Sequence, residues 1–409
     1  MVLRKASHLA QSARNILRVG KLRRARCSTG SVSDLRRRRR RLGSSGHYAE
    51  AQVADAPRTA PHVIPQLISG GLYLAMTLAG VIFSLVLLPL PCLSQPPAEQ
   101  IAAKAEKLKT VLAALKLPAT ENENYAAQLS RLERAARAGQ VLSGLYLLQQ
   151  LEPLLLALDY QKAKAEVEQG GLAAFEQEWL RLGPLLKEKE RPLLAKVPLR
   201  LPLALQGMSE RSLTQVQPYY QSGRLYGQQT TVANGLFYLG LAQAQLEFAR
   251  FCQSLALTAT GARPALRSLA PELAEVEQEI LQAYRQPGAA AQQNAFNRIN
   301  SALKVAQDLE RERRLSGALF QYLEVWRLFA ALLPPAEQAP LAALKTQSAA
   351  FRARLAQGKA DHSLAQLHWE VAQATLEAAQ PTQDQIKQAA AILNQVLPRY
   401  FKYSARSKR

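Results

Sequence analysis

Two histidines and their acidic neighbours are the first residues in this sequence that suggest metal chemistry. His362 and His368 are the only histidines after residue 62, and Asp361 and Glu370 lie close to them in the chain. Imidazole nitrogens together with carboxylate oxygens are the ligands that zinc takes in proteins. A zinc-binding helix carries its two histidines four residues apart on one face, whereas a six-residue separation places them on different faces. The sequence therefore predicts no metal site.

Motifs for hydrolysis and for nucleotide binding are the next features of interest. The segment 207–211, Gly-Met-Ser-Glu-Arg, begins like a nucleophile elbow but lacks its second glycine. Neither a phosphate-binding loop nor a dinucleotide fingerprint occurs in the chain. Acidic residues mostly alternate with basic ones, as in 187–191, a pattern typical of solvated helix faces. We predict no catalytic residue and no cofactor, and an enzyme or ligand carrier with a site between helices stays open as an alternative.

Tyrosines gather in two short stretches of the chain. Five of them are our candidates for a groove that binds a partner, namely Tyr219, Tyr220, Tyr226, Tyr400 and Tyr403. Burial in a core is the default interpretation of an aromatic residue, but a tyrosine also presents a hydroxyl to a ligand. The third chemically distinctive side chain, Cys252, lies in an apolar stretch and is predicted to be a buried core thiol.

The elements that must position these residues are helices. Ile101, Ala105, Leu108 and Leu112 recur every three or four residues, and Pro118 ends that pattern. Alanine, leucine and other strong helix formers dominate the chain after residue 98, and no alternating strand pattern occurs there. We predict an all-α fold, a helical bundle or solenoid-like region. Glycine and proline predict helix ends at 170–171, 183–184, 207, 261, 287–288, 334–335, 358 and 381.

An internal duplication is the second prediction about architecture. Leu142-Ser143-Gly144 opens one apolar helical stretch and Leu315-Ser316-Gly317 opens another, and further matching residues follow both in the same order. We predict two similar multi-helix units at 98–227 and 268–409, with an additional helix at 228–260. If the units fold independently, the fragment 268–409 is soluble, helical and melts cooperatively.

An apolar segment at 63–94 indicates that the chain is directed to a membrane. Residues 59–98 contain no charged side chain, and the stretch Leu67 to Leu90 is long enough to cross the hydrocarbon layer. The segment fits either a transmembrane anchor or a signal peptide. Cys92 and Ser94 supply the small residues that signal peptidase prefers, with cleavage after Ser94.

Residues 1–60 are predicted to be a disordered basic arm. Arg36 to Arg41 are consecutive arginines, and like charges at this density prevent packing. Three interpretations fit the arm. It binds an anionic surface, for which nucleic acid is the less favoured candidate; it is a mitochondrial import signal; or it reflects an over-extended gene start, with translation beginning at Met76 instead of Met1.

The charge asymmetry around the apolar segment predicts orientation. Basic residues are concentrated before it, which places the N-terminus in the cytoplasm and residues 99–409 on the exported side. We predict a membrane-targeted, exported, all-helical interaction or scaffold protein of the bacterial cell envelope, with a protein or polymer partner. A mitochondrial inner-membrane protein with an imported helical domain is the alternative location.

Overall fold

Helices build the part of the chain that the computed structural model describes, which comprises residues 95–195, 200–286, 292–332, 340–357, 359–378 and 380–406. Of these described residues 84% are helical and none forms a strand, which confirms the predicted all-α class. The predicted arm at 1–60, the apolar segment at 63–94 and the cleavage residues Cys92 and Ser94 lie outside the described residues.

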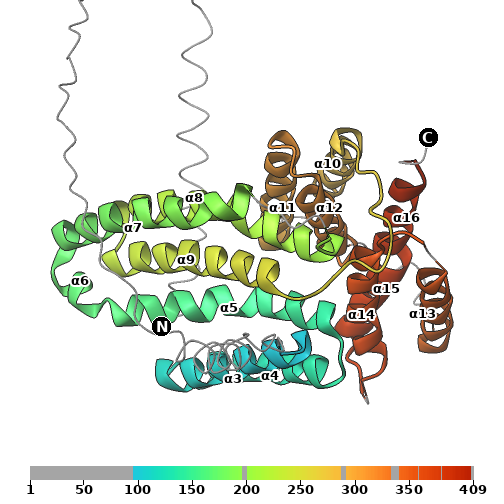
Figure 1. The fold of residues 1–409 in the computed structure, drawn as a ribbon, viewed down its shortest axis with the longest axis horizontal. Helices are drawn as coiled ribbons and strands as arrows, with labels where there is room; N and C mark the ends of the chain where they lie inside the picture. The colour runs from blue at the N-terminus through green and yellow to red at the C-terminus, as the bar shows by residue number, and fades with distance from the viewer. Residues whose placement is uncertain are drawn as a thin grey trace, which may run out of the picture. The chain divides into compact units, whose positions relative to one another are not determined.

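The helices are shown in chain order in Figure 1: α3 (Pro97–Leu115), α4 (Ala119–Arg137), α5 (Val141–Ala163), α6 (Ala165–Gln169), α7 (Gly171–Ala195), α8 (Leu203–Gln229), α9 (Val232–Ser254), α10 (Ala270–Tyr284), α11 (Gln293–Arg311), α12 (Leu315–Ala330), α13 (Leu341–Ala356), α14 (Ser363–Leu376), α15 (Gln383–Ala391) and α16 (Leu397–Arg406). A π-helical turn, Ile392–Val396, joins α15 directly to α16. All these helices belong to one compact unit, Pro89–Arg409.

The apolar spacing read from the sequence matches the buried face of α3. Ile101, Ala105, Leu108 and Leu112 are its buried residues, and they share one face because they lie three or four positions apart. Lys116, with a φ of 54°, follows the helix in the left-handed conformation, and the extended backbone of Pro118 leads into α4.

Two of the predicted helix ends are wrong. α7 continues through Gly183 and Pro184, and α8 continues through Gly207. Gly207 allows α8 to pack closely against α12. A Cβ atom at this position would lie 2.8 Å from the Cβ of Phe320 and 2.9 Å from the carbonyl oxygen of Ser316. A glycine that marks a close crossing of helices has the same sequence signal as a glycine that ends a helix, so the pattern misled the prediction.

α5 is a central helix of the fold. It packs against α3 and α4 on one side and against α9 and α14 on others, and in Figure 1 α9 lies between α5 and α8. Among the described residues it is the only helix long and apolar enough to cross a membrane, and 67% of its most apolar stretch is buried by the protein itself. The length and composition of α5 hint at membrane association. Its apolar side chains are also explained by their burial against the neighbouring helices.

Two buried glutamates cap the first turns of helices other than their own. Glu210 on α8 caps α12, and Glu370 on α14 caps α5. Gly317 N–H donates to Glu210 Oε2 over 2.7 Å, and Ser143 N–H donates to Glu370 Oε2 over 3.0 Å. The first N–H groups of a helix have no partner within it, and the positive end of the helix dipole favours a carboxylate. We call these two contacts the glutamate caps.

Each of these glutamates is held by a glutamine one turn earlier on its own helix. Gln206 Nε2 donates to Glu210 over 2.5 Å on α8, and Gln366 Nε2 donates to Glu370 over 2.9 Å on α14. Burial raises the pKa of both carboxyl groups above the ordinary value, whereas the hydrogen bonds from the amides and from the capped backbone lower it. The two caps therefore have the same local chemistry.

The helices that carry the glutamates begin side by side at Asp361. This buried carboxylate accepts from Leu203 N–H over 2.6 Å and from Ser363 N–H over 2.9 Å, so one side chain caps α8 and α14 together. Ser363 adds a second link, because its hydroxyl accepts from Ala204 N–H over 3.0 Å. The start of α8 is thus fixed to the start of α14.

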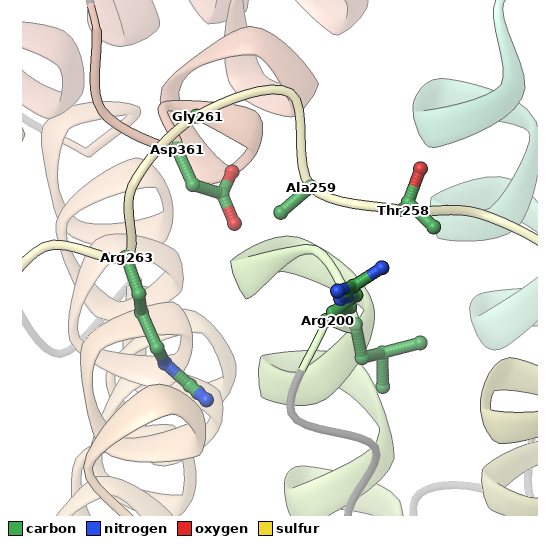
Figure 2. Close-up of a pocket in the computed structure, with 7 residues that line it drawn as sticks. Arg200, Thr258, Ala259, Gly261, Arg263 and Asp361 are labelled. Carbon is green, nitrogen blue, oxygen red and sulfur yellow. The ribbon is translucent and has the colours of Figure 1, made fainter.

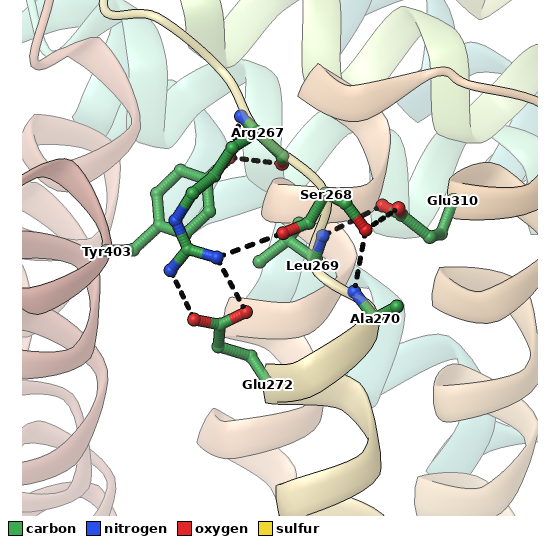
Figure 3. A network of polar contacts seen from close by, with 7 residues as sticks. All are labelled: Arg267, Ser268, Leu269, Ala270, Glu272, Glu310 and Tyr403. Atoms are coloured by element: carbon green, nitrogen blue, oxygen red, sulfur yellow. Dashed lines mark hydrogen bonds and ion pairs between the residues drawn. The ribbon is translucent and has the colours of Figure 1, made fainter. Parts of the chain in front are cut away.

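The linker between α9 and α10, residues 255–269, is held along its length by other parts of the fold. Ala262 and Ala360 form an isolated parallel bridge. Figure 3 shows the next contacts, where the Tyr403 hydroxyl donates to the Arg267 carbonyl oxygen over 2.7 Å and accepts from its N–H over 2.8 Å. Arg267 also pairs with Glu272, and Glu310 accepts from the Ser268 hydroxyl over 2.6 Å. The linker is therefore part of the packed structure.

Packing runs between the regions 98–227 and 268–409 that the sequence predicts as units. α5 contacts α14, α8 contacts α12, and the larger hydrophobic core draws residues from both regions. The two glutamate caps also connect a helix of one region to a helix of the other. The duplication itself stays a prediction, but the structure indicates that neither region buries its core alone.

Substitution of Gly317 by alanine tests the close approach at the first cap. A Cβ there would lie 2.8 Å from Leu309 Cδ2 and 2.9 Å from Glu210 Cβ, so we expect Gly317→Ala to lower the free energy of unfolding by about 1–3 kcal/mol. Gly144→Ala is the matched control, since its nearest neighbour would be 3.5 Å away and alanine favours helix. Urea unfolding followed by circular dichroism measures both, and equal effects would contradict the packing described.

Separate expression of the two regions tests their mutual dependence. We expect the fragment 268–409 alone to be helical but to melt without cooperativity, because it lacks Glu210 and the core residues of α3–α5. Co-expression with the fragment 95–260 is expected to restore a sharp thermal transition. A cooperative melt of the isolated fragment would show instead that the region folds independently.

Candidate functional site

A groove of about 630 Å³ between helices is the best candidate site in the described residues. α4, α5, α8 and α9 contribute to its wall, and α11 and α12 complete it. Amide side chains are its main polar groups, and six glutamines line it: Gln128, Gln149, Gln150, Gln215, Gln245 and Gln321. We call it the polar groove. Its position places it between the regions 98–260 and 268–409.

The buried glutamines of the groove are fixed by contacts with neighbouring helices. Gln149 Nε2 donates to the Met208 carbonyl over 3.2 Å, and Gln321 Oε1 accepts from Arg211 Nε over 2.7 Å. Gln245 is 5% exposed, and its Oε1 has no hydrogen-bond partner among the described residues. A buried acceptor without a partner costs free energy, so its place in the lining of a groove suggests that a ligand completes it.

A buried charge cluster forms part of the polar groove's wall and extends behind it. Glu324 and Arg327 line the groove, and they pair with each other over 3.0 Å. The Tyr146 hydroxyl donates to Glu324 Oε2 over 2.8 Å, and His368 Nδ1 lies 4.0 Å from Glu324 Oε1. Burial raises the pKa of Glu324, but the charge of Arg327 and the hydrogen bonds from Arg327 and Tyr146 lower it, and the net shift is downward.

His368 is the least satisfied member of this cluster. It is fully buried, and neither of its ring nitrogens has a hydrogen-bond partner among the described residues. Burial lowers its pKa to about 4, because the imidazolium would lose its hydration, and the nearby Glu324 carboxylate offsets only part of that loss. The ring is therefore neutral near pH 7.

A set of stacked tyrosines adjoins the polar groove at Tyr219. Tyr219 lines the groove, and its ring centroid lies 6.2 Å from that of Tyr238. Tyr226 stacks on Tyr238 with the centroids 4.5 Å apart and the planes 8° from parallel. All three rings are partly exposed. We call Tyr219, Tyr226 and Tyr238 the tyrosine platform, which includes two of the five tyrosines singled out in the sequence.

The other three predicted groove tyrosines are core residues. Tyr220 stacks on Trp179 with centroids 4.8 Å apart, and its hydroxyl donates to the Trp179 carbonyl over 2.9 Å. Tyr400 is 1% exposed and contacts His362, whereas Tyr403 holds the α9–α10 linker at Arg267. Their buried hydroxyls serve internal contacts, so they are placed to stabilise the fold.

A smaller cavity of about 380 Å³ lies where the α9–α10 linker passes the start of α8. Figure 2 shows Arg200, Arg263 and Asp361 around it, with the Arg263 side chain directed away from Asp361. Arg263 donates to Ser316 Oγ over 3.0 Å and also binds Gln206. Arg263 and Asp361 are thus committed to internal contacts. Because the polar groove gathers more polar side chains from more helices, we prefer it as the site.

The residues with metal or nucleophilic chemistry occupy separate positions. His362 precedes α14, and its Nδ1 lies 3.0 Å from the Tyr400 hydroxyl. Within the described ranges no three His, Cys, Asp or Glu side chains gather closely enough to hold a metal ion. Cys252 is fully buried in the core, where burial raises the pKa of its thiol. In the described part of the chain, neither histidine nor this thiol faces the polar groove.

The chemistry that the polar groove offers is hydrogen bonding. Glutamine amides present one acceptor and two donors each, and they do not change charge with pH. Both oxygens of Glu324, the one acid in the lining, already accept hydrogen bonds from Arg327. A carboxylate held in this way positions its neighbours more readily than it transfers protons. The arrangement therefore suits recognition of a polar ligand.

Sequence reasoning missed the groove glutamines and Tyr238. A usable signal existed, since Gln149 and Gln321 each follow a Leu-Ser-Gly sequence within two turns on an otherwise apolar helix face. An uncharged polar residue on a buried face needs a partner, which marks it as a structural or binding residue. Tyr238 carried no signal of its own, because its role depends on α9 lying beside α8.

Comparison of the chain with protein-family models, with curated proteins and with solved structures found no match in any of the three.

Replacement of His368 tests the buried charge cluster. The folded pKa of about 4 lies below the ordinary 6.5, so its contribution to stability is complete above pH 6.5 and is lost as the pH falls towards 4. We expect the difference in unfolding free energy between wild type and His368→Leu to change by up to about 1.4 kcal/mol per pH unit across that window. Urea unfolding near pH 7 and near pH 4.5 measures it, and parallel profiles would contradict this burial.

Proposed function

We propose that this chain is a membrane-targeted, exported interaction protein of the bacterial cell envelope that holds a polar, extended partner in its polar groove. The observation that supports the proposal most directly is the lining of the groove, where six glutamine side chains surround about 630 Å³ of space. Buried amide groups are costly unless they are hydrogen-bonded, and a partner with many donors and acceptors would satisfy them.

The polar groove also has the support that a binding site requires. Its wall is built on helices, and Gln149 and Gln321 are oriented by hydrogen bonds to residues of α8. The glutamate caps fix α12 to α8 and α5 to α14, so both sides of the groove are tied to one framework. A preorganised site loses less conformational entropy on binding.

The apolar segment at 63–94 and the basic residues before it support the proposed placement outside the cytoplasm. Cleavage after Ser94 or retention as an anchor gives the same sidedness for residues 99–409. In the anchored form, the arm at 1–60 would bind anionic lipid on the cytoplasmic side. The proposal keeps two similar units, and the matching chemistry of the two glutamate caps supports that duplication. A mitochondrial inner-membrane location remains the alternative address.

An enzyme or ligand carrier is the second candidate, and the buried charge cluster is the observation that favours it. Glu324 borders the polar groove and His368 lies behind Glu324, so a ligand in the groove would lie next to a carboxylate with a shifted pKa. Shifted pKa values cluster at functional sites but also occur in structural ion pairs. The hydrogen bonds that Glu324 accepts from Arg327 and Tyr146 favour the structural role.

Labelling of single cysteines with a membrane-impermeant maleimide tests sidedness and occupancy together. Gln150→Cys places a thiol on an exposed lining residue of the groove, and Leu180→Cys places one on α7 at a residue that is 61% exposed. Both go into a chain in which Cys27 and Cys92 are serine. We expect Leu180→Cys to react in intact cells, and Gln150→Cys to react at least about tenfold more slowly there than in the purified protein, because bound partner excludes the reagent.

The Leu180→Cys variant is the control for access to the exported side. Reaction of both thiols only after lysis would contradict export. A Gln150→Cys rate in cells equal to that of the purified protein, after correction for Leu180→Cys, would show that the groove is empty and would contradict the proposed function.

A further inference from the structure

We propose that the polar groove and the tyrosine platform together bind an acidic glycan, a chain of sugar rings that carry carboxylate groups. This inference rests on the proposed function and names the class of partner. Four observations carry it: the amide lining, the unpaired Gln245 acceptor, the excess of arginine over acid, and the continuity of the groove with stacked aromatic rings.

The amide lining matches the hydroxyl groups of a sugar. Each sugar hydroxyl donates one hydrogen bond and accepts others, and each glutamine amide offers a donor and an acceptor side by side. Gln245 lines the groove and its Oε1 is buried without a partner among the described residues, so a ligand hydroxyl that reached it would supply the missing donor. A carboxylate-only ligand would leave this acceptor without a partner.

The charge of the groove indicates that the glycan is acidic. Arg211, Arg298 and Arg327 line it, whereas Glu324 is the only acid and is paired with Arg327. Arg298 on α11 is exposed and forms no ion pair with any described residue. Guanidinium groups recognise planar carboxylates through paired N–H donors, so the two remaining arginines fit uronate groups on a sugar chain.

The tyrosine platform extends this recognition beyond the groove. Tyr219 belongs to both, and the Tyr226 and Tyr238 rings stack at 4.5 Å beyond it. Aromatic faces carry partial negative charge, and the C–H groups on the flat face of a sugar ring carry partial positive charge. A sugar ring that extends out of the groove past Tyr219 would therefore pack on the tyrosine platform.

Two other polymers fit the same observations less well. A nucleic acid would require a dense row of cations along its phosphates, yet the groove lining supplies only two arginines that are not paired with an acid. An acidic peptide would satisfy the arginines, but its backbone has one N–H donor per residue, which is fewer than the hydroxyl donors that a sugar ring offers. These two classes therefore serve as the competing outcomes of the test.

Calorimetric titration of the full chain in detergent micelles tests the inference with four probes of equal length. They are the hexamer of galacturonic acid, a neutral glucose hexamer, hexaglutamate and a thymidine hexanucleotide. We expect the uronate hexamer to bind most tightly and the neutral hexamer about tenfold more weakly, because it lacks carboxylates for Arg211 and Arg298. Tighter binding of hexaglutamate or of the oligonucleotide would overturn the glycan assignment.

Matched variants locate the binding. Arg298→Gln is expected to weaken uronate binding about tenfold, whereas Arg191→Gln on α7, an exposed arginine outside the groove lining, leaves it unchanged. Gln245→Leu is expected to weaken both the uronate and the glucose hexamer, with a thermal melt as the check on folding. An affinity for the uronate hexamer that neither Arg298→Gln nor Gln245→Leu changes would overturn the inference.

The glycan assignment and the proposed function can fail independently of each other. Protection of Gln150→Cys in cells together with failure of the uronate hexamer to bind would overturn the glycan assignment and leave the groove as a binding site. Mass spectrometry of the hexamer after incubation completes the test. An intact chain is expected, and a shortened chain would overturn a purely binding role.

Discussion

The fold depends on buried carboxylates that bind the N-terminal N–H groups of helices other than their own. Asp361 holds the starts of α8 and α14 together, and Glu210 and Glu370 then hold the starts of α12 and α5. Helix ends that are buried need partners from elsewhere, since their first N–H groups have none within the helix. In this chain three of these four contacts join residues at least 107 positions apart, and together they fix how four helices cross.

The polar groove is a consequence of that arrangement. α8 is the common element, because it carries Glu210, accepts the Gln149 amide at Met208 and directs Arg211 at Gln321. The residues that line the groove are therefore positioned by the packing of α8 against α12, which also joins the two regions of the chain. Loss of the Glu210 cap would disturb the groove through α8, because the buried Gly317 N–H group would be left without its partner.

The sequence was sufficient for the fold class and for the buried face of α3, because amphipathic spacing is a local property. It failed at Gly183 and Gly207, where glycine permits close packing and does not end a helix. The glutamate caps were beyond prediction, since a capping acid in the sequence looks like any other acid on a helix. Tyr219 and Tyr226 were candidates because tyrosines cluster in that stretch of the sequence, but the residue that joins them into a platform, Tyr238, depends on the packing of α9 against α8.

The π-helical turn between α15 and α16 has a consequence for changes in chain length at this point. A π turn contains one more residue than an α turn, so Ile392–Val396 records a single extra position within an otherwise continuous helix. Each residue of an α-helix advances the side chains by 100°, so removal of one position here would rotate Tyr400 and Tyr403 away from Asp361 and Arg267. The number of residues between α15 and α16 therefore matters more for these two contacts than the residue types within the turn.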